Sequence, residues 1–254
     1  MLFEEGWLTV IIPAFNERLR LAPTMREIEV FHRKYPDVIK QIVLVDDGST
    51  DNTMEIALQC TAKLPAHVVR LPENSGKWAA IHKGMELAQT DAMLILDADG
   101  SAQITELKRM HPDNLEWVRK HKVTLFGSRF SSGSTVEGKS FLRSVVSQGY
   151  RVYVLGMYWF ATGRKDIDDM QCPYKLIWGS TLLEMFNEKR FCGDLELACC
   201  IQGKIENRPV KFIHMRGSKV KTETIWEMFK GTWRVAMRFR KLYHGKSENE
   251  NRKV

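Results

Sequence analysis

Short apolar runs alternate with helix-like stretches through the first hundred residues, and this alternation constrains the fold more than any other feature. The apolar runs are rich in Val, Ile and Leu, and they cover residues 7–14, 41–45, 67–71 and 92–96. Such runs are typical of strands that are buried on both faces of a parallel sheet. The stretches between them have helical character and cover residues 21–35, 52–63 and 77–89. The sequence therefore predicts an α/β fold with a mostly parallel central sheet and helices on both faces.

Each predicted strand is followed at once by a polar loop. The loops are Pro13-Ala-Phe-Asn-Glu17, Asp46-Asp-Gly-Ser-Thr-Asp51, Asn74-Ser-Gly-Lys77 and Asp97-Ala-Asp-Gly100. Taken singly, each loop has a plain structural explanation as a turn or a helix cap. In an open α/β sheet, however, the carboxyl ends of the parallel strands meet along one edge, where ligands bind. Four polar loops at that edge predict one shared binding crevice.

The pair Asp97 and Asp99 suggests the chemistry of this crevice. Mg²⁺ and Mn²⁺ commonly bind one or two protein carboxylates together with substrate phosphates, and such an ion neutralises a diphosphate leaving group. Asp46 or Asp47 is a candidate acceptor for hydrogen bonds from a nucleobase or ribose, and Lys77 is a candidate cation beside the diphosphate. Neither G-x-G-x-x-G nor G-x-x-x-x-G-K-[ST] is present, which argues against a dinucleotide-dependent dehydrogenase and a P-loop nucleotidase.

Composition and charge narrow the class of protein further. The chain has 254 residues and a net charge of +7, which suits an anionic partner such as a nucleotide or a membrane surface, and we expect no nucleic-acid partner. Its five cysteines include no C-x-x-C pair, so we expect reduced thiols in a cytoplasmic protein. We expect neither a signal peptide nor a membrane-spanning segment, because the first residues are acidic and no uncharged apolar run reaches 18 residues.

In order and spacing, the four loops resemble the motifs of the inverting GT-A glycosyltransferases of family two. The resemblance rests on Val10-Ile-Ile-Pro-Ala-Phe-Asn-Glu17, Val45-Asp-Asp-Gly-Ser-Thr-Asp51, Asn74-x-Gly-Lys77 and Leu96-Asp-Ala-Asp-Gly100. It implies a GT-A fold, transfer of a sugar from a nucleoside diphosphate, and Mg²⁺ or Mn²⁺ bound by Asp97 and Asp99. It also implies that loop residues bind the nucleotide-sugar donor. This donor set comprises Pro13, Ala14, Phe15, Asn16, Glu17, Asp46, Asp47, Gly76, Lys77, Asp97 and Ala98.

The second half of the chain resembles the polyprenyl-phosphate branch of that family. The resemblance rests on Gly127-Ser-Arg129, Arg143, Asp194-Leu-Glu196, Gly217-Ser-Lys219 and the run Asp169-Met-Gln-Cys-Pro-Tyr-Lys175. The last run is closest to the Asp-Thr-Gln-Cys-Gly-Phe-Lys motif of dolichyl-phosphate glucosyltransferases. The resemblance implies UDP-glucose as the favoured donor, GDP-mannose as the next, and a polyprenyl or dolichyl phosphate as the acceptor. It further implies that Lys219 closes over the diphosphate.

The chemistry of the acceptor determines which other residues the reaction needs. A polyprenyl phosphate is already anionic, so it needs cationic guidance rather than a general base. Arg129 and Arg143 are the candidates, because arginine binds phosphate through paired hydrogen bonds. A sugar hydroxyl would instead require a carboxylate base, for which Asp194 is the candidate. Together with Asp97 and Asp99, these three residues form the predicted catalytic set.

A basic amphipathic stretch bears on where the protein works. It covers residues 222–243, between a catalytic domain expected over 1–221 and a polar tail over 244–254. One helical face carries Ile225, Phe229, Trp233 and Met237, and another carries Lys230, Arg234, Arg238 and Lys241. This stretch and the apolar segment 145–160 each either lie on an anionic membrane or pack on the catalytic domain.

These readings lead to one favoured hypothesis and two alternatives. We expect a peripheral enzyme at the cytoplasmic face of a membrane, where a membrane-anchoring partner chain is a further expectation. The first alternative is a soluble glycosyltransferase that acts on a sugar, glycan or small-molecule hydroxyl. The second is a non-catalytic nucleotide-sugar-binding protein, against which the intact set of catalytic candidates argues.

Overall fold

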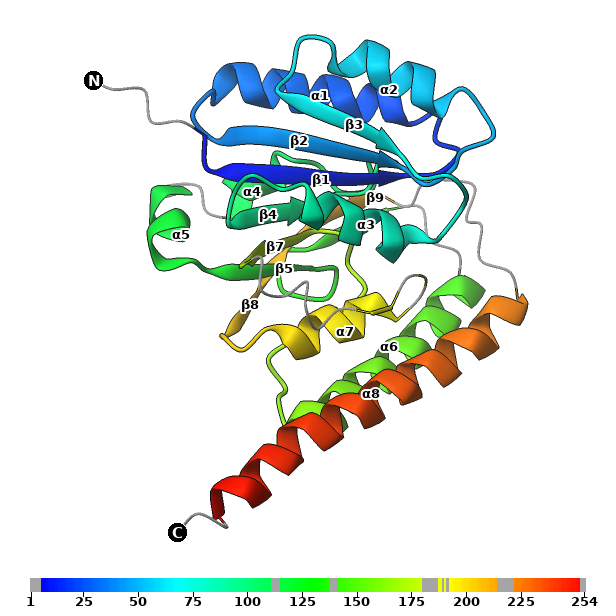
Figure 1. The fold of residues 1–254 in the computed structure, drawn as a ribbon, viewed down its shortest axis with the longest axis vertical. Helices are drawn as coiled ribbons and strands as arrows, with labels where there is room; N and C mark the ends of the chain where they lie inside the picture. The colour runs from blue at the N-terminus through cyan, green and yellow to red at the C-terminus, as the bar shows by residue number, and fades with distance from the viewer. Residues whose placement is uncertain are drawn as a thin grey trace.

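The computed structural model describes residues 6–110, 115–137, 141–179, 187–188, 190, 192–213 and 222–251, and leaves the side chains of 110, 141–146, 222–225 and 244–251 undescribed. Its described part forms a seven-stranded central sheet in the order β3-β2-β1-β4-β7-β5-β8 (Figure 1). The strands are β1 (Leu8–Ala14), β2 (Ile39–Asp46), β3 (Ala66–Arg70), β4 (Ala92–Ile95), β5 (Thr124–Ser128), β7 (Lys175–Trp178) and β8 (Ile205–Pro209). The four strands expected in the first half are therefore confirmed. A separate small sheet pairs β6 (Thr135–Glu137) with β9 (Lys211–Ile213).

One strand of the central sheet runs against its neighbours. Strands β1 to β4 pair in parallel, as predicted, and β5 pairs in parallel with β8. Strand β7 lies antiparallel between β4 and β5, with Lys175 opposite Ile95. Because β7 starts where β4 ends, its first residue lies at the edge of the sheet that carries the carboxyl ends of the parallel strands.

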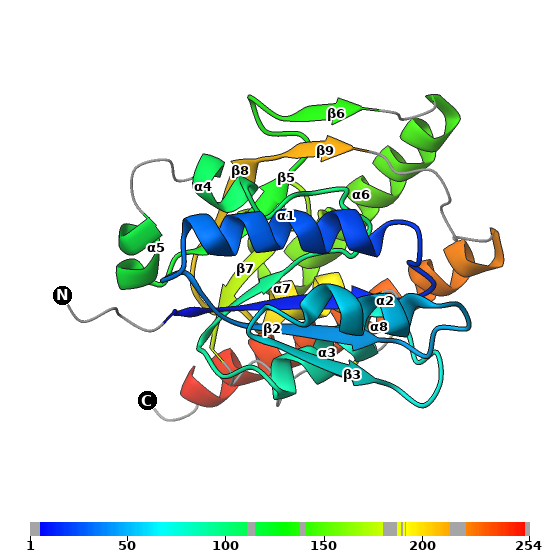
Figure 2. The same cartoon turned by 90° about the horizontal axis from the view of Figure 1, so that it is seen from above.

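Helices cover both faces of the sheet because side chains of a strand alternate between faces. On β1, Leu8, Val10 and Ile12 pack in the core that α1 (Leu21–Lys34) and α2 (Thr53–Thr61) cover. Ile11 points to the other face and packs against α3 (Lys77–Glu86). Figure 2 shows β1 and β2 between α1 and α3. Two short helices, α4 (Glu106–Met110) and α5 (Leu115–His121), precede β5.

Three helices from the second half cover the α3 face. They are α6 (Phe141–Thr162), α7 (Gly193–Cys200) and α8 (Thr222–Asn251), and α6 and α8 lie side by side (Figure 1). On α6, Val154 and Tyr158 are buried in the core of that face, as are Val235 and Phe239 on α8. The apolar segment 145–160 and the amphipathic stretch 222–243 are thus both helical, and α8 continues beyond residue 243.

The buried face of α8 differs from the apolar stripe expected from the sequence. The buried face is formed by Thr232, Val235, Ala236 and Phe239. Of the expected stripe, Phe229 packs against this core, whereas Trp233 is 51% exposed. No helix among the described residues is both long enough and apolar enough to cross a bilayer.

Candidate active site

The Asp97–Asp99 pair lies at the carboxyl end of β4, beside the first turn of α3. Asp97 Oδ1 is 2.6 Å from Lys77 Nζ, and the Asp97 side chain remains 24% exposed. Asp99 Oδ1 accepts a hydrogen bond of 2.9 Å from the Ser101 amide. Burial lowers the pKa of Lys77, but the charges of Asp97, Asp194 and Asp99 outweigh it and raise that pKa overall. Lys77 therefore carries a positive charge beside the carboxylate pair, as the sequence predicts for a diphosphate site.

The donor atoms of this pair suit a hard divalent cation. Within the described part of the chain, no group of three or more His, Cys, Asp or Glu side chains can hold a metal ion. A closed zinc-type cage is therefore absent from those residues, whereas Mg²⁺ or Mn²⁺ needs only one or two carboxylates plus phosphate oxygens. Asp97 Oδ1 is buried and, apart from Lys77, has no hydrogen-bond partner among the described residues. Asp97 and Asp99 thus fit the ion that the sequence predicts.

The two neighbouring aspartates after β2 have different surroundings. Asp46 is fully buried, where its Oδ1 accepts a hydrogen bond from the Ser49 amide at 3.1 Å and its Oδ2 lies 3.4 Å from Arg70 Nε. Asp47 accepts hydrogen bonds from the loop that precedes α3, from the Ser75 amide at 2.8 Å and the Gly76 amide at 2.9 Å. Both carboxylates are thus engaged by the chain itself.

Asp47 therefore shapes the loop before α3. Its Oδ2 also accepts a hydrogen bond from Asn74 Nδ2 at 3.1 Å, so one carboxylate holds three successive residues of that loop. Burial raises the pKa of Asp47, although the amides of Ser75 and Gly76 act in the opposite direction. The sequence could not reveal this contact, because 29 residues separate Asp47 from Gly76.

The first and second loops are joined by hydrogen bonds. Asn16, which adopts a positive φ of 53°, donates its amide to Ser49 Oγ at 2.9 Å and accepts from the Thr50 amide at 2.8 Å. The Glu17 amide donates to Thr53 Oγ1 at 2.7 Å. Pro13 and Ala14 are the last residues of β1, and Phe15 follows them half-buried. The predicted donor residues of these two loops therefore lie together.

Arg129 is already paired in the structure. It follows β5, and its guanidinium donates to both oxygens of Asp169, from Nε at 2.7 Å and from NH2 at 2.9 Å. The Arg129 amide donates to the same carboxylate at 3.1 Å. Arg143 lies in α6 with an undescribed side chain, and Lys219 lies outside the described residues. An acceptor phosphate would therefore share Arg129 with Asp169, and the assignments of Arg143 and Lys219 stay predictions.

Asp194 and Lys175 form an ion pair that the sequence did not single out. Asp194 lies in the first turn of α7, and its Oδ1 is 2.6 Å from Lys175 Nζ. Lys175 is buried, although it begins the apolar strand β7. A lysine at the start of an otherwise apolar run was the available signal for this contact, because a buried ammonium group requires an anionic or hydrogen-bonding partner.

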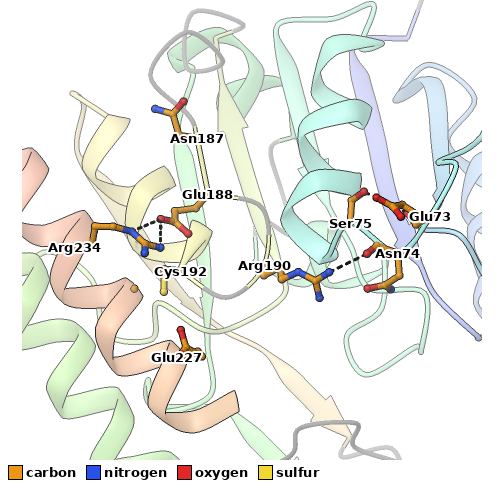
Figure 3. A pocket seen from close by; sticks show the side chains of 10 residues that line it. Glu73, Asn74, Ser75, Asn187, Glu188, Arg190, Cys192, Glu227 and Arg234 are labelled. Carbon is orange, nitrogen blue, oxygen red and sulfur yellow. Dashed lines mark hydrogen bonds and ion pairs between the residues drawn. The ribbon is translucent and has the colours of Figure 1, made fainter. Parts of the chain in front are cut away.

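A polar pocket of about 600 Å³ lies beside the loop before α3 (Figure 3). It is lined by Glu73, Asn74, Ser75, Asn187, Glu188, Arg190, Cys192, Glu227, Gly231 and Arg234. Arg190 donates to the Asn74 carbonyl at 3.0 Å, and Glu188 pairs with Arg234 of α8 at 2.9 Å. The pocket thus connects the loop that Asp47 holds to the N-terminal half of α8.

Comparison with known proteins agrees with this arrangement of fold and site. Residues 9–150 match the model of glycosyl transferase family 2, more than half of the chain, and the chain belongs to this family. A dolichyl-phosphate beta-glucosyltransferase of Dictyostelium discoideum is 29% identical over 84% of this chain and 68% of its own length. One of Drosophila melanogaster is 28% identical over 90% of this chain and 77% of its own length.

Solved structures of low sequence identity share the fold. Glucosyl-3-phosphoglycerate synthase from Mycobacterium tuberculosis, in complex with Mn²⁺, UDP-glucose and phosphoglyceric acid, gives a TM-score of 0.66 at 12% identity, over 92% of this chain and 80% of that chain. Mannosyl-3-phosphoglycerate synthase from Rubrobacter xylanophilus gives a TM-score of 0.60 at 14% identity, over 95% of this chain and 75% of that chain. These likenesses establish the GT-A fold that the sequence motifs imply.

Proposed function

We propose that this family-2 glycosyltransferase moves glucose from UDP-glucose to a dolichyl or other polyprenyl phosphate, with inversion at the sugar carbon. The observation that carries the proposal is the meeting of Lys77, Asp97, Asp99 and Asp194 at one sheet edge, in a chain whose relatives are named dolichyl-phosphate beta-glucosyltransferases. Those relatives match most of this chain, the second half included, so the likeness extends beyond the donor-binding loops.

The residues of the crevice have different roles in the proposed reaction. Asp97 and Asp99 would hold Mg²⁺ or Mn²⁺, which supplies positive charge to the diphosphate as its bond to the sugar breaks. Lys77 adds a fixed positive charge beside the same group. Asp194 faces the crevice from α7 and binds the transferred sugar. The acceptor phosphate is itself the nucleophile and needs no base, while Arg129 and Arg143 orient it.

An assay of donor and metal use tests this proposal. Wild-type protein is incubated with UDP-glucose or GDP-mannose, a short polyprenyl phosphate and Mn²⁺, and the released nucleotide is measured. We expect UDP release that requires the lipid phosphate and stops with a chelator. Asp99→Ala should lower kcat by about 1000-fold, because it weakens metal binding at the leaving group.

Asp37→Ala is the matched control, because Asp37 is exposed and precedes β2, at the opposite end of the strand from the loop that starts at Asp46. It should keep wild-type kcat. Both variants should retain the wild-type melting temperature, since Asp99 is only half-buried. Normal turnover of Asp99→Ala at limiting metal would show that the metal assignment is wrong. If the wild-type protein turned over none of the donors, the proposal that it is an enzyme would be refuted.

A hydroxyl acceptor is the second candidate, and the buried faces of α6 and α8 favour it. Val154 and Tyr158 of α6 and Val235 and Phe239 of α8 pack in the protein core, as expected of a soluble transferase. Asp194 would then act as the general base. The same assay with free sugars in place of lipid phosphate decides the matter, since only this candidate gives nucleotide release that depends on the sugar.

We further propose that the protein associates peripherally with the cytoplasmic face of a membrane through the outer faces of α6 and α8. Val152 and Trp159 are seven residues apart on α6, as are Trp226 and Trp233 on α8, and all four side chains are exposed. Residues seven apart lie on one helical face. Aromatic side chains on such a face favour the membrane interface.

The charge of α8 contributes less to this association than the sequence implied. Arg234 pairs with Glu188, Arg238 pairs with the buried Glu196, and Lys230 pairs with Glu227 at 3.3 Å, so three of the four cations of the predicted basic face have an anionic partner within the protein. Lys230 lies 5.4 Å from the centre of the Trp226 ring, at the exposed surface. The aromatic side chains are therefore the main contact with lipid, and a membrane-anchoring partner chain would strengthen it.

Flotation with vesicles of neutral and anionic lipid tests the membrane proposal. The double variant Trp159→Ser/Trp226→Ser should lose binding to anionic vesicles, because each tryptophan contributes apolar area at the interface. Trp117→Ser is the matched control, since Trp117 is also exposed but belongs to α5, which lies apart from α6 and α8 (Figure 1). Equal flotation of both variants would contradict the assignment of this surface.

A further inference from the structure

Lys175 is a buried charged side chain to which the reaction described above assigns no role. Its side chain is 2% exposed, and its Nζ lies 5.3 Å from the centre of the Phe126 ring and 6.0 Å from that of Trp78. An ammonium group in such surroundings costs free energy unless hydrogen bonds and an opposite charge compensate it. The position of Lys175 in the core therefore calls for a physical reason.

Two contacts compensate the charge of Lys175, and they leave the pair asymmetric. Its Nζ donates to the Cys172 carbonyl at 2.5 Å and to Asp194 Oδ1 at 2.6 Å. Asp194 is less deeply placed, since 24% of its side chain is exposed. It also lies in the first turn of α7, where the helix dipole favours a carboxylate. The lysine is thus sealed in the core while the carboxylate reaches the crevice.

Asp194 also acts on the other charged groups of the site. Its charge attracts both Lys77, which pairs with Asp97, and Arg129, which follows β5. Movement of the Asp194 carboxylate would therefore disturb the region where the donor and the acceptor meet. The Lys175 hydrogen bond restrains that movement through one of the two carboxylate oxygens, Oδ1.

Stability alone does not account for this pair. Replacement of both members of a buried ion pair by apolar side chains of similar volume is often neutral or stabilising. Methionine has such a volume and would pack against Phe126 and Trp78. What a lysine supplies at this position, and methionine does not, is a hydrogen bond that orients Asp194.

We propose that Lys175 is a positioning residue of the sugar-transfer reaction, which acts by holding the Asp194 carboxylate toward the transferred sugar. The proposal rests on the function proposed above. Lys175 itself touches no substrate. The antiparallel strand β7 makes this role possible, because it brings Lys175 to the sheet edge at which β4 and its carboxylates end.

A double-mutant cycle on kcat tests the proposal. Lys175→Met should lower kcat by about 100-fold, the cost of a misplaced catalytic contact, with the donor KM little changed. Lys175→Arg should restore part of the loss, because it keeps a donor and a charge. In the Asp194→Asn background, Lys175→Met should change kcat by less than about twofold, as coupled residues are not additive.

An equal loss in both backgrounds would overturn the proposal, since Lys175 would then act independently of Asp194. Lys204→Met, at an exposed lysine, is the matched control and should keep wild-type kcat. Loss of one member of a buried ion pair is destabilising, so the melting temperature of Lys175→Met should fall, and kcat is compared at a temperature at which every variant is folded. A kcat of folded Lys175→Met equal to that of the wild type would mean that the pair serves stability instead.

A second measurement needs no turnover and separates this proposal from the proposed function. The ¹³C signal of the Asp194 carboxylate, assigned by its loss in Asp194→Asn, is recorded in the wild type and in Lys175→Met. We expect a shifted or broadened signal in the variant, because the carboxylate loses its fixed hydrogen bond. An unchanged signal would refute the positioning role even if sugar transfer is confirmed, and a changed signal supports it even if the acceptor is different.

Discussion

Asp47 provides the sharpest test of how the donor crevice is built. Replacement of Asp47 by Asn puts an amide NH₂ where one carboxylate oxygen stood. If the NH₂ group takes the position of Oδ2, it faces two donors, the Gly76 amide and Asn74 Nδ2, which lie 2.9 Å and 3.1 Å from Asp47 Oδ2. With the side-chain amide turned over, NH₂ faces the Ser75 amide at 2.8 Å instead. Either orientation opposes donor to donor in a residue that is 2% exposed.

The expected loss of stability follows from the less costly orientation of the side-chain amide in Asp47→Asn, which is the one with NH₂ toward the Ser75 amide. It loses one hydrogen bond to a charged acceptor and leaves one buried amide unpaired, at a cost of about 2 to 3 kcal/mol in the free energy of unfolding. For a domain of this size, that loss lowers the melting temperature by about 4 to 10 °C. Because the loop leads into Lys77, which pairs with Asp97, the KM for the donor should rise by at least about 10-fold as well.

Thermal unfolding and steady-state kinetics with varied donor and acceptor measure these effects. Asp37→Asn is the control, because it removes the same charge from an exposed position. Burial raises the pKa of Asp47, so the Asp47 carboxylate binds a proton more tightly in the folded chain than in the unfolded chain. Its contribution to stability therefore decreases as pH rises from the unfolded to the folded pKa, and is constant above that range. Equal stability and equal donor KM of the two variants at neutral pH would refute the role of Asp47.

Two further predictions concern packing and thiol chemistry. Gly84→Ala places a Cβ 2.4 Å from Ile11 Cγ2, so it should destabilise the protein by about 1 to 2 kcal/mol despite the helix propensity of alanine. The added Cβ of Gly156→Ala meets no atom within 4 Å, so this variant should be more stable than the wild type by about 0.5 to 1 kcal/mol. Urea denaturation compares them, and equal shifts would contradict the packing. Burial raises the pKa of the Cys192 thiol to about 11, and Cys60 is the only cysteine that is not buried, so a thiol reagent at pH 8 should label Cys60 first and the others only on unfolding. Fast labelling of two or more thiols in the folded protein would contradict this.

The local sequence determines the first half of the fold and the place of the donor site. Each of the runs 7–14, 41–45, 67–71 and 92–96 is apolar because its strand is buried on both faces, and β1 to β4 form where they were expected. Polar loops at the carboxyl ends of parallel strands must meet, so the convergence of Asp47, Lys77 and Asp97 on one edge could be predicted from sequence. Family motifs added the roles that are proposed for these residues, since such motifs imply a chemistry that strand patterns do not.

Only the tertiary structure decides which side chains pair across the second half. Arg129 meets Asp169 over 40 residues of chain, Lys175 meets Asp194 over 19, and each contact depends on the antiparallel β7 between β4 and β5. Arg238 similarly turns from the expected lipid-facing surface to Glu196, over 42 residues. The periodicity of a sequence indicates which residues are buried, but not which residues they contact. Strand order and long-range pairing are set by the packing of the whole chain, and they determine which of its charges remain available for catalysis.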